Sequence, residues 1–246
     1  MNTALTSFLS VARLIGLASP TATQTTQVYT GNVAKYPVAL TLTVSGNLAH
    51  GTLLYTRSGI PIRVVGTLNG SALLLHEFDT KGTITGLYNG VQTSTGYTGT
   101  WYSPSIPNKE MPFSLLIDAP TAAPTPVALA NLTGTYAYSY GRKAGYGKLF
   151  VQQTEPGRIV VAMQAAANES ARTMIVIDQT VLKLTGNQAT YSSYEINYRT
   201  IRLTFFDGGA CVHYVGGADP EEVGQPTVTG NYIRTETKLP VFPPLN

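Results

Sequence analysis

Short turns recur at close spacing through the first half of the chain, and this feature limits the fold more than any other. Residues 36–46, YPVALTLTVSG, alternate apolar and small residues with a strict period of two, which is the pattern of a strand with one buried face. Two Asn-Gly pairs are strong signals for tight hairpins, because both positions tolerate positive φ. The turn signals are Ser45-Gly46-Asn47, Arg57-Ser58-Gly59, Asn69-Gly70, Lys81-Gly82 and Asn89-Gly90.

The spacing of these turns predicts about eight strands in residues 27–118, each joined to the next by a short connection. Such a meander exposes two strand edges unless it closes, and eight strands are enough to close a small barrel. Residues 131–236 repeat the plan with seven strand candidates. The predicted fold class is therefore all-β, with two small antiparallel meander β-barrels.

Proline and alanine are frequent in residues 119–130, where no strand period is visible, and this composition predicts a linker between the two barrel domains. Residues 237–246 are blocked by prolines, which predicts an irregular tail.

The first 22 residues contain an apolar segment that ends in small residues, as a secretory signal peptide does. Two features depart from that pattern, because the n-region has no Lys or Arg and Arg13 interrupts the apolar run. Cleavage after Ala18 or Ala22 is the expectation, and a structural N-terminal helix is the alternative. We therefore predict a periplasmic or secreted protein. The segment is too short and broken to span a bilayer, so no transmembrane segment is predicted.

One phrase, Thr-Gly-x-aromatic, occurs four times, at residues 85–88, 98–101, 133–136 and 229–232. Glycine lets a strand bend or approach its neighbour closely, and the aromatic residue two positions later packs across strands. The phrase therefore predicts the corners of a closing barrel. A series of rings that stack on a ligand is the functional alternative.

The stretches LTGTYAYS and YTGTWYS, which carry two of these phrases, resemble the Gly-x-aromatic strand of the lipocalin and avidin-like barrels. The chain is also similar to exported bacterial proteins of uncharacterised function that are built from small β-barrels. The resemblance implies a calycin-like barrel shape. It implies no ligand residues, because neither a biotin-site set nor a second lipocalin motif can be traced, and Trp101 falls on about the seventh strand of its half.

Several kinds of chemistry lack a signature in this chain. The net charge is +3 without a Lys/Arg cluster, so nucleic-acid binding is not predicted. No nucleophile elbow, phosphate-binding loop or dinucleotide fingerprint occurs, and the three histidines lack zinc-ligand spacing. The single cysteine, Cys211, excludes an internal disulfide, and we expect an ordinary buried thiol there. No catalytic set, metal or cofactor is therefore predicted.

Two groups of residues are candidates for binding. Glu77 and Asp79 share a strand face with Leu73 and Leu75. They could line a barrel mouth, where burial would raise the pKa of a carboxyl group, or form an acid/base pair. The third alternative is that they lie on a solvated rim. The second group is a row of tyrosines on one strand face, followed by a basic turn: Tyr136, Tyr138, Tyr140, Arg142 and Lys143. The row could be an exposed surface for sugars or a protein partner, or a packed layer inside the barrel.

The leading hypothesis for function is a non-enzymatic extracytoplasmic binding module, whose partner is an envelope glycan, a small apolar ligand or a protein. It rests on the missing catalytic set and on scaffolds that commonly bind through mouths and loops. The alternatives are a hydrolase that uses Glu77 and Asp79 at a barrel mouth, and a purely structural envelope protein. Fold analogy alone does not choose among them.

Overall fold

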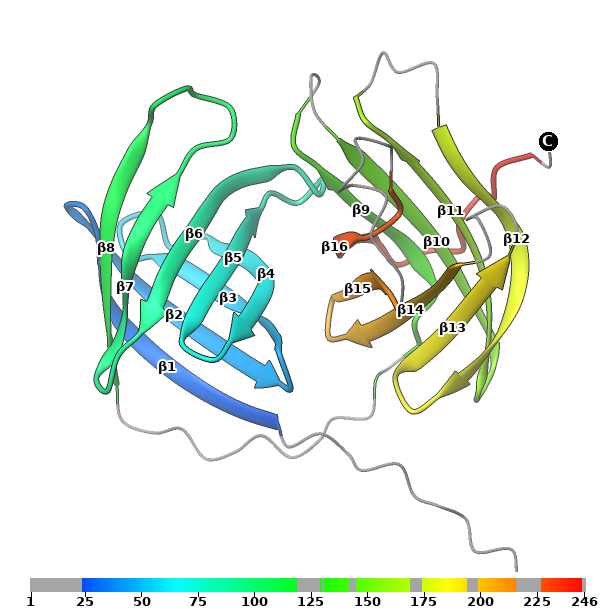
Figure 1. Cartoon of the computed structure of the whole chain (residues 1–246), viewed down its shortest axis with the longest axis horizontal. Helices are drawn as coiled ribbons and strands as arrows, with labels where there is room; N and C mark the ends of the chain where they lie inside the picture. The colour runs from blue at the N-terminus through cyan, green and yellow to red at the C-terminus, as the bar shows by residue number, and fades with distance from the viewer. Residues whose placement is uncertain are drawn as a thin grey trace, which may run out of the picture.

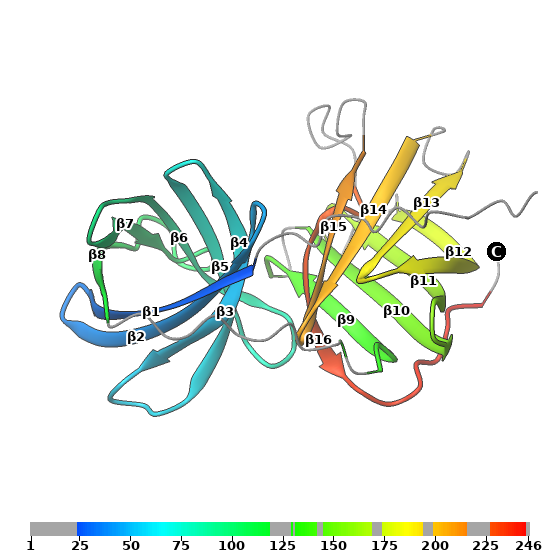
Figure 2. The ribbon, with the colours of Figure 1, turned by 90° about the horizontal axis from the view of Figure 1, so that it is seen from below.

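The computed structural model describes residues 24–118, 129, 131–141, 145–168, 174–193, 199–215 and 227–244. In this part of the chain sixteen strands form two closed antiparallel barrels of eight strands each, which lie side by side (Figures 1 and 2). The predicted fold class is confirmed. Within the same residues, no helix has the length and apolar character needed to cross a bilayer.

The first barrel is a simple meander in which each strand pairs with the next, and β1 pairs with β8 to close the wall. β1 and β2 are in register along their whole length, from the pair of Val33 and Tyr36 to that of Gln24 and Ser45. The strands are β1 (Gln24–Val33), β2 (Tyr36–Ser45), β3 (Leu48–Tyr55), β4 (Pro61–Asn69), β5 (Ala72–Phe78), β6 (Ile84–Gln92), β7 (Gly96–Tyr102) and β8 (Glu110–Ile117).

The second barrel has the same plan and closes through β9, which pairs with both β10 and β16. The shortest strand pairing in this wall is between β12 and β13, which share two residue pairs in the described region. The strands are β9 (Gly134–Ser139), β10 (Tyr146–Glu155), β11 (Arg158–Ala166), β12 (Met174–Thr185), β13 (Gln188–Ser193), β14 (Arg199–Phe206), β15 (Gly209–Tyr214) and β16 (Gly230–Glu236).

The described residues include only parts of the three segments that were predicted outside the barrels. The predicted signal peptide, residues 1–22, lies outside the described residues, and so does nearly all of the predicted linker, residues 119–130. Of the predicted tail, residues 237–244 are described and form no strand.

The glycines of the four Thr-Gly-x-aromatic phrases lie where the barrel wall leaves no room for a side chain. At Gly134 an added Cβ would lie 2.1 Å from the carbonyl oxygen of Glu236, and at Gly99 it would lie 2.2 Å from that of Asn89. The predicted close approach of neighbouring strands is confirmed at these two glycines, whereas at Gly86 and Gly230 the nearest atoms belong to side chains. The aromatic residues two positions later are all buried, with at most 7% of their surface exposed: Tyr88, Trp101, Tyr136 and Tyr232.

Aromatic and leucine side chains fill both barrels. The largest fully buried side chains of the described chain include Tyr88, Tyr97, Tyr136, Tyr232 and Phe205. An eight-stranded barrel is just wide enough for side chains to fill. Each barrel interior is therefore a packed core, which is close-fitting and sensitive to changes in volume.

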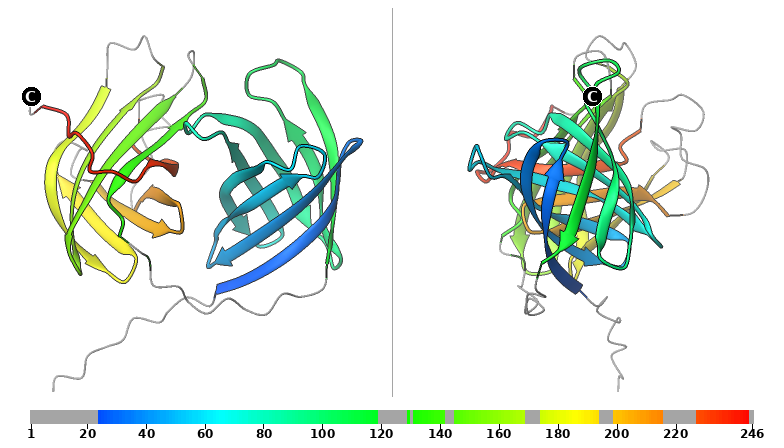
Figure 3. Two further views of the ribbon diagram at one scale, coloured as in Figure 1. Left: turned by 180° about the vertical axis from the view of Figure 1, so that it is seen from behind. Right: turned by 90° about the vertical axis from the view of Figure 1, so that its left-hand side faces the viewer.

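The barrels contact each other through the outer side of β3, β4 and β5, which faces β9, β16 and the β14–β15 turn (Figures 1 and 3). The Ser139 amide donates a hydrogen bond to the Gly82 carbonyl at 2.8 Å. Thr83 and Ser139 form an isolated parallel β-bridge between the two barrels. Four apolar side chains of the first barrel belong to the same buried cluster as the core of the second: Leu48, Val65, Phe78 and Ile84. We call this contact, together with His50, His76, Tyr140 and Phe206, the interbarrel face.

Truncating a ring inside a barrel is expected to destabilise the protein strongly. Tyr232 is fully buried, and its hydroxyl donates to the Val228 carbonyl at 2.7 Å. Tyr232→Ala should lower the free energy of unfolding by about 3–5 kcal/mol, as large aromatic truncations do. Tyr102, 38% exposed on β7, supplies the matched control Tyr102→Ala, which should change it by less than about 1 kcal/mol. Urea unfolding followed by circular dichroism measures both, and equal losses would contradict the packed-core assignment.

Candidate functional site

Two of the three tyrosines in the predicted row point into the second barrel. Tyr136 and Tyr138 are 1% and 7% exposed, because alternate residues of β9 face the interior. The Tyr136 hydroxyl donates to the Leu132 carbonyl at 2.8 Å, and the Tyr138 ring lies edge-on to that of Tyr232 at 4.8 Å. Of the two alternatives for the row, the packed layer holds for these two residues, and the exposed surface does not. Arg142 and Lys143 of the predicted basic turn lie outside the described residues.

The third tyrosine of the row, Tyr140, lies beyond the end of β9 and reaches the first barrel. Its hydroxyl is 2.9 Å from Nε2 of His76, and the two rings meet edge-on with centroids 5.8 Å apart. His76 comes from the outer side of β5, so this hydrogen bond joins the two barrels across the interbarrel face.

A cavity of about 150 Å³ lies beside this hydrogen bond, with walls from both barrels. We call it the interbarrel pocket. The first barrel contributes His76 and Ile84, and the second contributes the ends of β9, β10 and β16. The lining residues are His76, Ile84, Tyr138, Tyr140, Gly145, Thr229, Gly230 and Asn231. Aromatic faces and hydrogen-bonding groups therefore line the cavity together, and these lining residues include no acidic, lysine or arginine side chain.

His76 is the titratable group in the wall of this pocket, and it is 8% exposed. Burial lowers the pKa of His76, and the adjacent Val65 backbone offsets part of that change. The imidazole is therefore uncharged at neutral pH, when one ring nitrogen donates and the other accepts.

A local pattern in the sequence does point to His76, although the histidine spacing does not. In LLLHEF, residues 73–78, apolar or aromatic side chains fall on both faces of the strand. A strand of that kind is covered on both sides. In the structure Leu75 and Glu77 face the barrel interior, and His76 and Phe78 face the second barrel.

Glu77 lies inside the first barrel and is 3% exposed. The Trp101 indole N–H donates to its Oε2 at 2.5 Å, and the pair fits because Gly86 has no side chain: a Cβ there would lie 2.1 Å from the same oxygen. Burial raises the pKa of Glu77, and the hydrogen bond from Trp101 opposes that rise. Glu77 does share one strand face with Leu73 and Leu75, but it is enclosed in the core and does not lie on a solvated rim.

Asp79 has a separate role in the turn that follows β5. Its Oδ1 accepts hydrogen bonds from the amides of Lys81 and Thr83, both at 2.8 Å, which caps the turn. Glu77 is enclosed among core side chains, and Asp79 is held by backbone amides. The two carboxylates therefore share no partner, and the structure presents no acid/base pair to a substrate.

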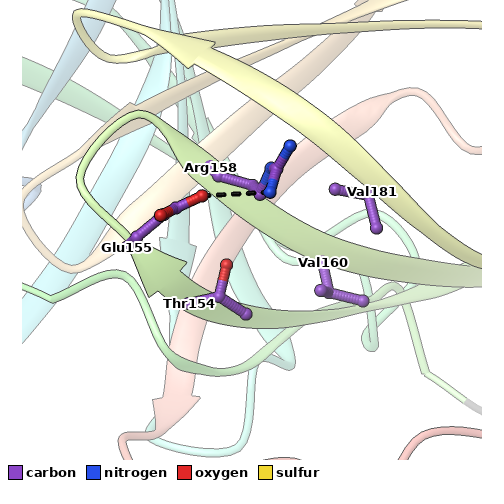
Figure 4. A pocket seen from close by; sticks show the side chains of 5 residues that line it. All are labelled: Thr154, Glu155, Arg158, Val160 and Val181. Carbon is purple, nitrogen blue, oxygen red and sulfur yellow. Dashed lines mark ion pairs between the residues drawn. The ribbon is translucent and has the colours of Figure 1, made fainter.

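A second hollow, of about 580 Å³, lies on the outer wall of the second barrel (Figure 4). It is lined by Thr154, Glu155, Arg158, Val160 and Val181. Glu155 and Arg158 pair at 3.1 Å, but both side chains are more than half exposed, and Val181 is 59% exposed. An exposed ion pair of this kind contributes little energy, so we regard the hollow as open surface.

The remaining reactive groups of the described residues do not assemble into a site. Burial raises the pKa of the Cys211 thiol to about 11, so the sulfur stays protonated and unreactive at neutral pH. In the described residues no three His, Cys, Asp or Glu side chains come together to hold a metal ion.

Comparisons with protein-family models, with curated proteins and with solved structures give no match to this chain. The candidate site therefore rests on its geometry, which favours the interbarrel pocket.

Glu77 should give the first barrel a pH-dependent stability. Because its pKa is raised in the folded state, the native protein keeps a proton that the unfolded chain loses above its ordinary pKa. The free energy of unfolding should therefore fall as the pH rises from about 4.5 to the raised pKa of the folded state. The total loss is about 1.4 kcal/mol for each unit by which folding raises this pKa. Glu77→Gln, which retains an acceptor for Trp101, should remove this loss.

Urea unfolding between pH 4.5 and 8 measures this effect. Glu110, exposed at the start of β8, supplies the matched control Glu110→Gln, which should keep the pH dependence of the wild type. Identical pH profiles for Glu77→Gln and the wild type would contradict the assignment.

Proposed function

We propose that the protein is a non-enzymatic extracytoplasmic binding module that holds a neutral, ring-sized group in the interbarrel pocket, with a sugar residue of an envelope glycan as the best candidate. The observation that carries the proposal is the pocket itself. It is built jointly by both barrels and combines tyrosine rings with neutral hydrogen-bonding groups.

The size of the pocket limits what it can take. A cavity of about 150 Å³ is comparable to one that holds a single six-membered ring, and it is smaller than the pockets that enclose whole drug-sized ligands. The occupant is therefore one unit of a larger molecule, or a small molecule with one ring. The end unit of a glycan fits this description, because the rest of the chain can remain in solvent.

The chemistry of the lining favours a sugar over an aromatic hydrocarbon or an ion. A sugar ring has apolar C–H faces that pack on Tyr138 and Tyr140, and hydroxyls that can pair with Asn231. His76 is uncharged at neutral pH and adds one donor or acceptor.

The two alternatives are less well supported. A hydrolase would need Glu77 in contact with a substrate, but this carboxyl is 3% exposed and faces the barrel core. A purely structural role is consistent with the filled barrels, and it predicts no specific ligand. The binding experiment below distinguishes it from the proposal.

Export is part of the proposal. The predicted cleavage sites after Ala18 and Ala22 precede β1, which begins at Gln24, so cleavage would leave all sixteen strands intact. The low proportion of charged residues, 12%, is consistent with an exported β-protein.

Binding can be tested by two-dimensional NMR with a panel of neutral monosaccharides and glycan fragments. We expect at least one sugar to shift the amide signals of Tyr140, Thr229 and Asn231. Asn231→Ala should weaken its binding about 5- to 20-fold, which corresponds to the loss of one or two hydrogen bonds. The exposed Asn89 on the outer side of β6 supplies the matched control Asn89→Ala, which should leave the affinity unchanged.

A panel in which no sugar shifts these signals would contradict the proposed ligand class. Shifts confined to residues outside the interbarrel pocket would contradict the proposed site.

The processing of the chain is tested separately. N-terminal sequencing of protein isolated from its native host should find a start at residue 19 or 23. An intact Met1 in a cytosolic fraction would contradict export.

A further inference from the structure

Two of the three histidines of the chain lie in the interbarrel face. His50 is on β3 and His76 is on β5, and both side chains extend from the outer wall of the first barrel toward the second. Among the described residues of the interbarrel face, they are the side chains whose ordinary pKa lies between neutral and acid pH.

His50 stacks on Phe206 of the second barrel, with ring centroids 4.6 Å apart and planes at 24°. The charged groups that face it are Arg63 on β4 and Asp207 in the β14–β15 turn. Arg63 Nη1 donates to the Asp207 carbonyl at 2.9 Å and lies 3.9 Å from its carboxylate, which is 85% exposed. The exposed carboxylate is therefore shared with Arg63 and exerts only a screened attraction on a charged His50.

His76 faces the Tyr140 hydroxyl from the second barrel and the Val65 backbone from β4. The ring of Phe78 lies beside it, with centroids 6.3 Å apart. The described lining of the interbarrel pocket has no carboxylate that could pair with an imidazolium. Both histidines therefore have aromatic neighbours and limited means to neutralise a positive charge.

We infer that acid separates the two barrels: protonation of His50 and His76 weakens the interbarrel face and takes apart the interbarrel pocket. As a mechanism of ligand release this inference rests on the proposed function, but the separation itself needs no ligand. The molecule would then bind at neutral pH and release in an acidic compartment or medium.

The direction of the effect follows from the protonation of each state. In the docked protein, burial lowers the pKa of His50 to about 4, and it also lowers that of His76. In separated barrels both rings reach water and regain ordinary values near 6.5. The separated state therefore binds more protons, and docking weakens as the pH falls through 6.5 toward 4. The pKa change of His50 alone corresponds to a weakening on the order of a hundredfold.

The barrels themselves are expected to survive this change. Each wall is closed by backbone hydrogen bonds that do not titrate. Glu77, inside the first barrel, has a raised pKa and is most stable there in its protonated form, so acid does not charge it. Loss of docking should therefore precede loss of the β-structure.

Small-angle X-ray scattering of the full chain from pH 7.5 to 3.5 tests the inference, with circular dichroism at each pH. The wild type should expand reversibly as the pH falls below 6.5 and keep its β-spectrum. The double variant His50→Gln/His76→Gln should stay compact over the range in which the wild type expands. The third histidine, exposed on β15, supplies the matched control His213→Gln, which should expand as the wild type does.

A chain that stays compact until its β-spectrum is lost would overturn the inference, and so would a double variant that expands at the wild-type pH. If the double variant does not fold, an NMR titration of the three wild-type histidines decides the question: ordinary pKa values for His50 and His76 in the compact protein would overturn it. Neither experiment contains a sugar, so a failure of the proposed function does not affect the result.

Discussion

Aromatic rings packed inside two eight-stranded barrels leave the barrel interiors filled, and the rest of the structure depends on this packing. Tyr88 and Trp101 occupy the first barrel, and Tyr136 and Tyr232 occupy the second, each two residues after a glycine. The glycines admit the rings and strands beside them, as Gly86 admits the contact between Glu77 and Trp101. Because the rings occupy the interiors, we propose a site between the barrels, at the interbarrel pocket.

The strand β5 contributes to both the core of the first barrel and the interbarrel face. Its inner face places Glu77 in the core of the first barrel, and its outer face places His76 against Tyr140 of the second. Burial acts in opposite directions on the two groups, raising the pKa of the carboxyl and lowering that of the imidazole. Both side chains are therefore favoured in their uncharged forms. Docking through His76 is therefore favoured while its ring is uncharged.

The fold was predictable from the sequence because its signals are local. Alternation in residues 36–46 and the repeated turns indicate hairpins. Alternation in β5 puts Glu77 on the face of Leu73 and Leu75, although its full burial is shown by the structure alone. Alternation also puts Tyr136 and Tyr138 on one strand face, but it does not say whether that face is inner or outer, so the sequence left both alternatives open and the structure decides for the inner face. The pocket was beyond prediction because His76 and Tyr140 are 64 positions apart and belong to different barrels.

At neutral pH the two barrels are docked through the outer side of the first barrel, which carries His50 and His76. Nuclear Overhauser effects between side chains measure this most directly, because they require protons within about 5 Å of one another. With His50 and Phe206 selectively labelled, the stacked rings predict strong cross-peaks between the two barrels at pH 7.5. Absence of these cross-peaks, together with separate tumbling rates for the two halves of the chain, would contradict the account.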